Sequence, residues 1–308
     1  MDLPVVVKDV HKAYGKVQAL SGLSFEVKPG ELFGFIGPDG AGKTTLFRIL
    51  TTLLIPDSGT ALVEGLDVVK DYKAIRRIAG YMPGRFSLYQ DLTVEENLNF
   101  FAGIFQTTVK ENYHLIEDIY KQIEPFKNRP AGKLSGGMKQ KLALSCALIH
   151  KPKVLFLDEP TTGVDAVSRT EFWDMLKRLQ QLGITILVST PYMDEASLCD
   201  RVALIQQGKL MDIDTPQAII DKLPGRMFAI SSSKMYAILL ELQKYNRALS
   251  AYPFGDSVHL HVIDTTFKTS DLESYLSEKG HSGYEIKEIN AGIEDCFMYL
   301  MEKHPAHA

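Results

Sequence analysis

The chain alternates between short apolar runs and segments whose apolar residues recur at helical spacing. Apolar runs at residues 32–36, 154–157 and 184–188 predict strands that are buried on both faces. The first two runs are followed by helix-period segments at residues 46–50 and 167–181. This alternation predicts an α/β fold built on a parallel sheet.

Two regions depart from the alternation. The opening, residues 5–27, is rich in β-forming residues, with strands expected near residues 4–10 and 23–27, and predicts a small antiparallel layer. Residues 84–150 turn helical, which predicts a helical lobe inserted into the α/β core. The helices expected in this lobe span residues 94–105 and 111–123.

A second domain is predicted after the core. A hairpin at residues 201–213, turning at Gln207-Gly208, precedes Leu223-Pro224-Gly225, which is typical of a linker. We therefore expect a domain at residues 1–223 and a small α+β domain of ferredoxin-like type at residues 226–308. Its expected strands lie at residues 227–231, 248–252, 258–263 and 284–289, and its helices at 234–245, 270–279 and 293–303.

The loop after the first buried strand carries phosphate-binding chemistry. Residues 37–45 read Gly37-Pro38-Asp39-Gly40-Ala41-Gly42-Lys43-Thr44-Thr45, a full G-x-x-x-x-G-K-[ST] motif between a strand and a helix. Glycines let backbone N–H groups at the helix N-terminus approach a triphosphate. Lys43 is placed to bridge the β- and γ-phosphates, and the Thr44 hydroxyl is a Mg²⁺ ligand.

Two carboxylates end the second buried strand. Asp158 is expected to hold Mg²⁺ from the neighbouring strand end, and Glu159 is the candidate base for the attacking water. The strand context of both motifs argues against a simple glycine-rich turn. The expected ligands are therefore a nucleoside triphosphate and Mg²⁺.

Leu134-Ser135-Gly136-Gly137-Met138 stands just before a helical segment. Leu142, Cys146 and Ile149 recur at helical spacing, which predicts an amphipathic helix that packs by one face and leaves its N-terminus free for a γ-phosphate. The alternative is an ordinary N-cap. Two adjacent glycines disfavour that alternative unless the backbone approaches a ligand.

In these motifs, and in their order and spacing, residues 5–223 resemble the ATP-binding subunits of ABC transporters, in particular drug-export ATPases of ABC-2 type. The resemblance implies a P-loop NTPase core and a dimer in which Leu134–Met138 caps the ATP of the opposite subunit. It implies that Tyr14 stacks on adenine, with core packing as the alternative. It also places Asp165 beside the partner subunit, where it is at the same time a candidate N-cap for the following helix.

Two positions depart from the family pattern. Gly84 stands where the family usually has a glutamine that senses Mg²⁺ and the attacking water, and Pro191 where it has a histidine that bonds the γ-phosphate. Neither residue has a side-chain donor. Gln90 substitutes for the missing glutamine only if its loop folds back. We therefore expect ATP and Mg²⁺ to bind, with slow hydrolysis at this chain's own site. The alternative is that Glu159 sustains hydrolysis alone.

Composition narrows the class. With 308 residues, 45% hydrophobic residues and a net charge of −4, nothing favours nucleic-acid binding. No apolar stretch approaches the roughly 18 residues that cross a bilayer, so the membrane part is expected to be a separate polypeptide. Cys146, Cys199 and Cys296 form no CxxC and are expected to be reduced thiols. We expect a peripheral protein on the cytoplasmic face of the inner membrane.

Several residues carry open alternatives. Phe86, Leu88, Tyr89 and Phe101 are candidates for contact with the membrane partner or are ordinary lobe core. His259 and His261 share one face of a strand, where solvated side chains are favoured over a metal site because no carboxylate or cysteine stands at ligand spacing.

The leading hypothesis is therefore the ATP-hydrolysing subunit of an ABC exporter. The alternative is a catalytically weak subunit that completes and regulates the ATP site of an unlike partner. A soluble ABC protein of translation or DNA repair is disfavoured, because such proteins usually carry two ATPase heads or long insertions.

Overall fold

In a computed structural model, residues 3–303 are described, and they form two compact units, residues 3–216 and 217–303. The division lies between Pro216 and Gln217, a few residues before the linker expected at 223–225. A short helix that the sequence pattern did not predict, α7 (Pro216–Asp221), begins at this division. No helix among residues 3–303 is long and apolar enough to span a membrane.

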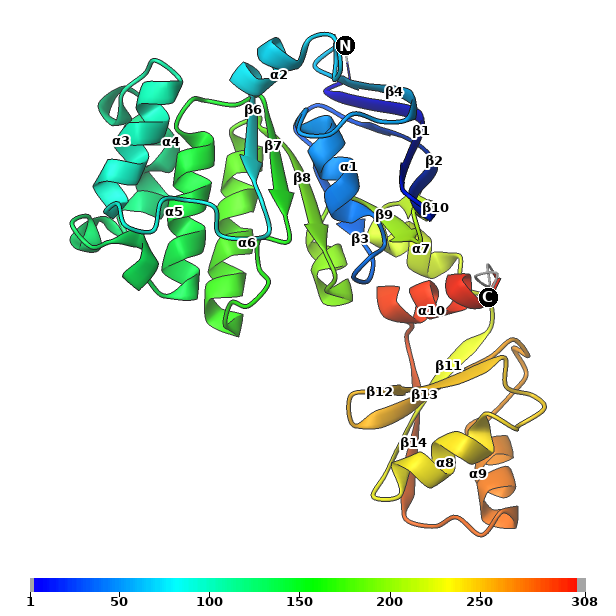
Figure 1. The fold of residues 1–308 in the computed structure, drawn as a ribbon. Helices are drawn as coiled ribbons and strands as arrows, with labels where there is room; N and C mark the ends of the chain where they lie inside the picture. The colour runs from blue at the N-terminus through cyan, green and yellow to red at the C-terminus, as the bar shows by residue number, and fades with distance from the viewer. Residues whose placement is uncertain (1–2, 304–308) are drawn as a thin grey trace. The chain divides into compact units, whose positions relative to one another are not determined.

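The first unit is built around a six-stranded sheet in the order β10-β9-β3-β8-β7-β6 (Figure 1). Neighbouring strands are parallel except for β10, which pairs antiparallel with β9. Its strands are β3 (Leu32–Ile36), β6 (Ala79–Met82), β7 (Val154–Asp158), β8 (Thr185–Thr190), β9 (Arg201–Gln206) and β10 (Lys209–Asp214). Every residue of β3, β7 and β8 is buried, which explains their continuous apolar runs.

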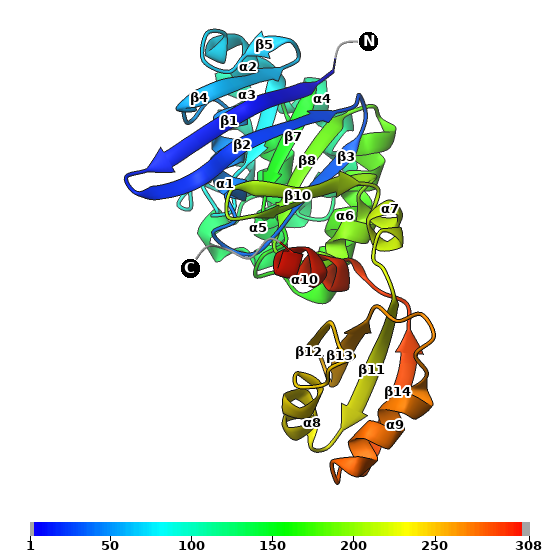
Figure 2. The same ribbon diagram turned by 90° about the vertical axis from the view of Figure 1, so that its right-hand side faces the viewer.

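An antiparallel sheet in the order β2-β1-β4-β5 forms a second layer (Figure 2). Its strands are β1 (Val5–Tyr14), β2 (Val17–Val27), β4 (Ser58–Val63) and β5 (Leu66–Asp67). β1 and β2 are longer than expected, since irregular register between Val7 and Ala13 lets the hairpin continue past the apolar part.

Helix α1 (Lys43–Leu50) lies between the two sheets, with Leu46, Phe47, Ile49 and Leu50 buried (Figure 1). Its Phe47 ring meets Phe35 of β3 and Phe156 of β7 edge to face, at centroid distances of 5.7 and 6.1 Å. This packing fixes the helix that begins with Lys43 against the two strands that carry the candidate site. α2 (Tyr72–Ile78) leads into β6.

The helical lobe consists of α3 (Val94–Ile104), α4 (Val109–Tyr120) and α5 (Gly136–Leu148), with short 3-10 turns η1 (Glu124–Phe126) and η2 (Ala131–Lys133). Thr93 and Thr108 begin α3 and α4 with capping boxes to Glu96 and Glu111. α5 is not the amphipathic helix expected. Its second half, from Leu144 to Leu148, is buried on all sides because it lies between the lobe and β6.

α6 (Ala166–Gln181) precedes β8, and the 3-10 helix η3 (Met193–Leu198) follows it. Asp165 is the N-cap of α6, where its side chain accepts a hydrogen bond from the Ser168 N–H at 3.0 Å. This bond, together with the Ser168 hydroxyl, lowers the Asp165 pKa.

The second unit contains a four-stranded antiparallel sheet in the order β12-β13-β11-β14. In chain order it reads β11 (Arg226–Ser232), α8 (Met235–Leu242), β12 (Ser250–Phe254), β13 (Ser257–Val262), α9 (Thr269–Glu278), β14 (Tyr284–Ile289) and α10 (Ile293–Lys303). This βαββαβ arrangement, with its first and third strands central, has the ferredoxin-like topology. A separate apolar core packs α8 and α9 on the sheet.

The expectation that His259 and His261 are solvated is wrong. Both are buried, because α10 covers this part of the sheet, with Asp295 beside His259 and the Tyr299 ring beside that of His261. His259 Nδ1 lies 2.7 Å from Asp295 Oδ1, which also accepts a hydrogen bond from Tyr252 at 2.6 Å. His261 Nε2 lies 2.6 Å from the Pro224 carbonyl oxygen. Both histidines therefore have hydrogen-bond partners within the protein.

Candidate functional site

The phosphate-binding loop joins β3 to α1 and ends at Gly42, whose φ of 106° is a conformation that favours glycine. A Cβ on Gly42 would lie 2.4 Å from the Ala19 carbonyl oxygen, and one on Gly37 would lie 2.1 Å from that of Ile205. Gly37 and Gly42 are thus required by close packing of β9 and β2 against the loop. The N-terminus of α1 supplies the backbone N–H groups that suit a triphosphate.

Lys43 is the first residue of α1, and its side chain reaches back over this loop. Its ammonium donates to the Gly37 and Pro38 carbonyl oxygens at 2.7 and 3.0 Å, and it lies 3.3 Å from Glu159 Oε1. The lysine side chain is 2% exposed and the glutamate 24% exposed. The structure therefore brings together the predicted phosphate-binding cation and the predicted base.

Thr44 and Asp158 meet as the sequence predicts for a pair of magnesium ligands. The Thr44 hydroxyl donates to Asp158 Oδ1 at 3.1 Å across the carboxyl ends of β3 and β7. Hard oxygen donors of this kind suit Mg²⁺, which usually takes few protein ligands and completes its shell with phosphate and water. No group of three or more His, Cys, Asp or Glu residues gathers into a metal cluster within residues 3–303, and a site of this sparse type needs none.

The remaining loop residues, Pro38, Asp39, Gly40, Ala41 and Thr45, lie where the motif places them, between β3 and the first turn of α1. Gly40 has a φ of 78° and open space around an ideal Cβ, so it is a turn position of the loop.

The segment Leu134–Met138 forms the start of α5. Leu134 is buried, and Ser135 is the N-cap, accepting from the Met138 N–H at 3.4 Å. Ser135 therefore caps the helix, and the exposure of Ser135 and Gly136 leaves the helix N-terminus accessible to a ligand. An ideal Cβ on Gly137 would lie 2.7 Å from Ser168 Oγ of α6, whereas one on Gly136 has only the Gly163 carbonyl oxygen nearby, at 3.4 Å. Gly137 is required by packing, and Gly136 presents its backbone outward.

Tyr14 ends β1 at the tip of the β1–β2 hairpin and is 47% exposed. It does not belong to the core, which leaves its ring available for stacking. The same hairpin contacts the phosphate-binding loop through Ala19, near Gly42. That contact is consistent with the predicted adenine contact.

Gly84 and Pro191 both lie beside the candidate site. An ideal Cβ on Gly84 would be 3.0 Å from the Asp158 carbonyl oxygen and 3.6 Å from Glu159 Cβ. Pro191 follows Thr190, whose carbonyl oxygen accepts from the Gly37 N–H at 3.3 Å. Gln90 instead lies against Gly132, to whose N–H its carbonyl bonds at 2.9 Å. Neither departure is compensated from its own segment.

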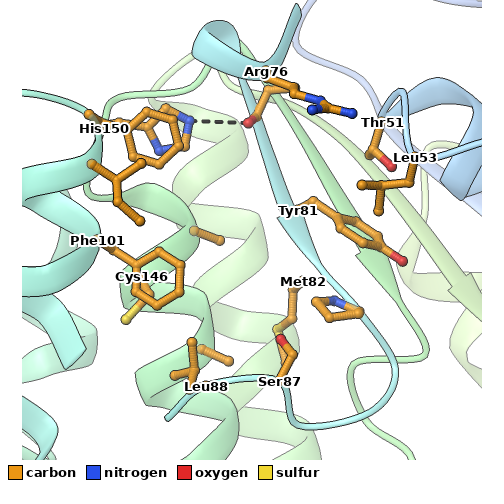
Figure 3. A pocket seen from close by; sticks show the side chains of 16 residues that line it. Thr51, Leu53, Arg76, Tyr81, Met82, Ser87, Leu88, Phe101, Cys146 and His150 are labelled. Atoms are coloured by element: carbon orange, nitrogen blue, oxygen red, sulfur yellow. Dashed lines mark hydrogen bonds between the residues drawn. The ribbon is translucent and has the colours of Figure 1, made fainter. Parts of the chain in front are cut away.

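An apolar cavity of about 590 Å³ opens between α1, β6 and the helical lobe (Figure 3). Leu88 and Phe101 line it, together with Leu53, Ile104 and Cys146. At the cavity wall, His150 Nε2 lies 3.1 Å from the Ala79 carbonyl oxygen. Burial lowers the His150 pKa. Burial, assisted by the Asp158 charge, raises the Tyr81 pKa to about 12.

Of the four aromatic and aliphatic candidates for partner contact, Leu88 and Phe101 line this cavity. Tyr89 is 52% exposed beside Phe100, and Phe86 lies under the Lys139 ammonium at 5.5 Å. Leu88 is therefore buried as part of the lobe core, whereas the exposed Tyr89 remains a candidate for partner contact.

Sequence reasoning missed two polar residues of the site. Ser189, at the end of β8, donates to Asp158 Oδ1 at 2.7 Å. Glu195, in η3, is 1% exposed and accepts from the Thr161 hydroxyl at 2.8 Å. A serine in an apolar strand, like the acidic pair Asp194-Glu195, is a weak signal, because only the fold shows what it faces.

Comparison with known proteins identifies the class that this geometry defines. Residues 20–162 match the family described as ABC transporter. A probable multidrug ABC transporter ATP-binding protein of Escherichia coli, YbhF, is 46% identical over 290 residues, covering 92% of this chain and 49% of that protein. Nod factor export ATP-binding protein I of Burkholderia orbicola is 35% identical, with 96% of each chain covered. This chain therefore spans about half the length of YbhF.

Solved structures agree. CbiO1 of Clostridium perfringens, part of the ABC transporter complex CbiONQ, matches 72% of this chain and 92% of its own with a TM-score of 0.64 at 28% identity. The dimeric cassette MJ0796, bound to ADP and Pi, matches 68% of this chain and 98% of its own with a TM-score of 0.62 at 26% identity.

The chain belongs to the family of ABC transporter ATP-binding proteins. The predicted P-loop NTPase fold and ABC ATPase class are confirmed, and the predicted exporter type agrees with the names of its relatives. Of the solved relatives, MJ0796 is a dimer bound to ADP and Pi, and CbiO1 is part of an ABC transporter complex.

Proposed function

We propose that this chain is the ATP-binding subunit of an exporter and couples ATP binding and hydrolysis to a separate transmembrane subunit. It works on the cytoplasmic face of the inner membrane, which it reaches through that subunit. One observation carries the proposal. Lys43, Thr44, Asp158 and Glu159 gather at one site, while the outward-facing N-terminus of α5 is free to complete a second one.

The nucleotide site is built across a dimer. ATP and Mg²⁺ bind at residues 37–45 and 158–159, and Leu134–Met138 of the opposite subunit supplies backbone N–H groups to the γ-phosphate. Tyr14 stacks on the adenine. In this arrangement Thr44 and Asp158 would hold the Mg²⁺, which when bound would supply electrophilic polarisation of the phosphate, and Glu159 would orient the attacking water.

The membrane partner docks in the apolar cavity of Figure 3, and Leu53, Phe101 and Ile104 contact it. Leu53 and Ile104 are 57% exposed each, and large apolar side chains exposed around a cavity favour a protein contact. The cavity also adjoins the segment that follows β6, where Gly84 lies beside Asp158. A partner in the cavity is therefore close to the catalytic carboxylates.

The second ATP-binding subunit is unlike this one. Gly84 and Pro191 remove two hydrogen-bond donors from the own site, whereas the α5 N-terminus that serves the opposite site is intact. A partner with the missing glutamine and histidine would give one composite site that hydrolyses ATP and one that mainly holds the dimer. In a homodimer both sites would lack the two donors.

A second function follows from the same departures. If the own site does not turn over at all, the chain is a regulatory subunit that completes the partner's site. Gly84 favours this alternative, because without a side chain it neither senses the ion nor relays partner contact.

The test is co-purification with a candidate membrane subunit, combined with ATPase measurements. Ile104→Glu should abolish co-purification and leave the ATP affinity of this chain unchanged, since it places a charge in the cavity. Leu182→Glu is the matched control, because Leu182 is 66% exposed outside this cavity. Retention of the membrane subunit by Ile104→Glu would contradict the docking site, and failure of the wild-type chain to bind ATP would contradict the function.

A further inference from the structure

Glu159, the candidate base, has an unusual backbone conformation. Its φ is 50°, in the left-handed region that non-glycine residues rarely adopt. Such a conformation costs about 1–3 kcal/mol and persists only where the surroundings hold it in place. Here it accompanies the approach of the carboxylate to 3.3 Å from the Lys43 ammonium. The base is therefore aimed by a strained turn, and something must hold that turn.

Ser189 holds the turn on its N-terminal side. The Glu159 N–H donates to the Ser189 carbonyl oxygen at 3.0 Å and lies 3.1 Å from the Ser189 hydroxyl. The same hydroxyl donates to Asp158. These bonds fix the residues up to Glu159, but they do not fix the direction in which the chain leaves it.

Thr161 and Glu195 hold the turn on its C-terminal side. Two residues after the base, Thr161 is 1% exposed and its hydroxyl donates to Glu195 Oε1 at 2.8 Å. Pro160 between them has a restricted φ, so fixing Thr161 restricts Glu159 as well. The Thr162 N–H donates to the Glu159 carbonyl oxygen at 3.3 Å and closes the turn.

Glu195 is itself held in place. The Arg169 Nε lies 3.7 Å from Glu195 Oε1, and its guanidinium pairs with Asp194 at 2.8 Å and lies over the Tyr192 ring at 5.0 Å. The other carboxylate oxygen, Oε2, is buried with no hydrogen-bond partner anywhere in residues 3–303. A buried carboxylate that is only partly paired costs stability, and one that is kept despite this cost is a candidate for a functional role.

We propose that Glu195 is a positioning residue that, through Thr161, holds Glu159 in its left-handed conformation and so aims the base at the nucleotide. The inference rests on the proposed role of Glu159 as base. It also gives the segment after Pro191 a role in hydrolysis, although that segment lacks the histidine expected of the family.

The experiment compares two substitutions of Thr161, one that keeps its shape and one that keeps its hydroxyl. Thr161→Val removes the hydroxyl that binds Glu195, and Thr161→Ser keeps it. Single-turnover hydrolysis with the full chain in excess over γ-labelled ATP separates the chemical step from nucleotide binding. We expect Thr161→Val to slow hydrolysis at least tenfold with the Kd for ATP unchanged within twofold, and Thr161→Ser to retain the wild-type rate within twofold.

Thr170→Val is the matched control, because it removes an exposed threonine hydroxyl that bonds the Ala166 carbonyl oxygen within α6 and makes no bond to Glu195. It should hydrolyse ATP at the wild-type rate. A rate for Thr161→Val equal to wild type would overturn the proposal. An equal loss of hydrolysis rate in Thr161→Ser would also overturn it. So would a fall in the ATP affinity and thermal stability of Thr161→Val as large as the fall in its rate.

A crystal structure of Thr161→Val gives a readout that needs no turnover. We expect Glu159 to leave the left-handed region and its carboxylate to move away from Lys43. If φ of Glu159 stays near 50°, Glu195 does not hold the turn. A wild-type chain that binds no ATP would instead refute the proposed function, while this structural comparison still decides the role of Glu195.

Discussion

Restoring the two missing donors should accelerate hydrolysis at this chain's own site. The perturbation is Gly84→Gln together with Pro191→His, which returns a side-chain amide and an imidazole beside Asp158, Glu159 and Gly37. A preorganised donor at a developing charge contributes about 2.7–4 kcal/mol, or roughly 10²–10³ in rate. Two such donors set the upper limit of the effect.

The structure lowers this expectation. An ideal Cβ at position 84 would lie 3.0 Å from the Asp158 carbonyl oxygen, so the loop must shift by a few tenths of an ångström to accept glutamine. At position 191 the surrounding side chains are packed around a proline rather than arranged to orient an imidazole. A donor misplaced by about 1 Å loses much of its effect on the rate. We therefore expect at least a tenfold increase, about 1.4 kcal/mol of the barrier.

The assay is steady-state phosphate release by the purified chain, with saturating ATP and Mg²⁺. Gly84→Ala with Pro191→Ala is the matched control, since it makes the same backbone changes, including the new backbone N–H at position 191, without adding a side-chain donor. Adding Lys43→Ala to the Gly84→Gln, Pro191→His variant gives a background control, and any phosphate release that remains comes from a contaminating ATPase. A wild-type rate that is already high, or an equal gain in the alanine control, would refute the argument that missing donors limit this site.

Three further outcomes are expected. Lys43→Ala should weaken ATP binding at least 100-fold, about 2.7 kcal/mol, because the ammonium is the main point charge on the phosphates; nucleotide titration measures this, and unchanged affinity would contradict the pocket. Gly136→Asp should suppress turnover of the assembled complex while this chain's own ATP binding persists, because the new side chain fits beside Gly163 but sets a carboxylate against a γ-phosphate. Gly136→Ala should stay active. Full activity of the aspartate variant would exclude the α5 N-terminus from catalysis. Asp295→Ala should destabilise the second unit by about 3–5 kcal/mol in chemical denaturation, because it strands buried His259, whereas Tyr252→Phe should cost about 1 kcal/mol. Equal effects of the two substitutions would show that the His259–Asp295 contact is not what matters.

The sequence predicted the parts of the site whose chemistry is written in local motifs. The glycines of residues 37–42, Lys43, Thr44 and the strand ending in Asp158 and Glu159 are local patterns, and βα alternation predicts that parallel strands bring their carboxyl ends together. The same reasoning predicted the ferredoxin-like order of the second unit, because strand and helix periods differ clearly there.

Long-range packing escaped prediction. Leu142, Cys146 and Ile149 suggested one apolar face of α5, but Leu144 and Leu148 are also buried, since lobe and sheet enclose the helix from several sides. His259 and His261 looked solvated because their partners, Asp295 and the Pro224 carbonyl oxygen, are more than 30 residues away in the chain. Glu195 could not be assigned, since only the fold brings η3 to Thr161.

The central claim is that this chain's pocket holds ATP without rapid hydrolysis while its α5 N-terminus serves a second site. Photolabelling of the assembled complex with azido-ATP tests it most directly, with the label on either the α- or the γ-phosphate. After one turnover of the complex, this chain should retain both labels, and its ATP-binding partner only the α-label. Loss of the γ-label from both subunits at the same rate would contradict the claim.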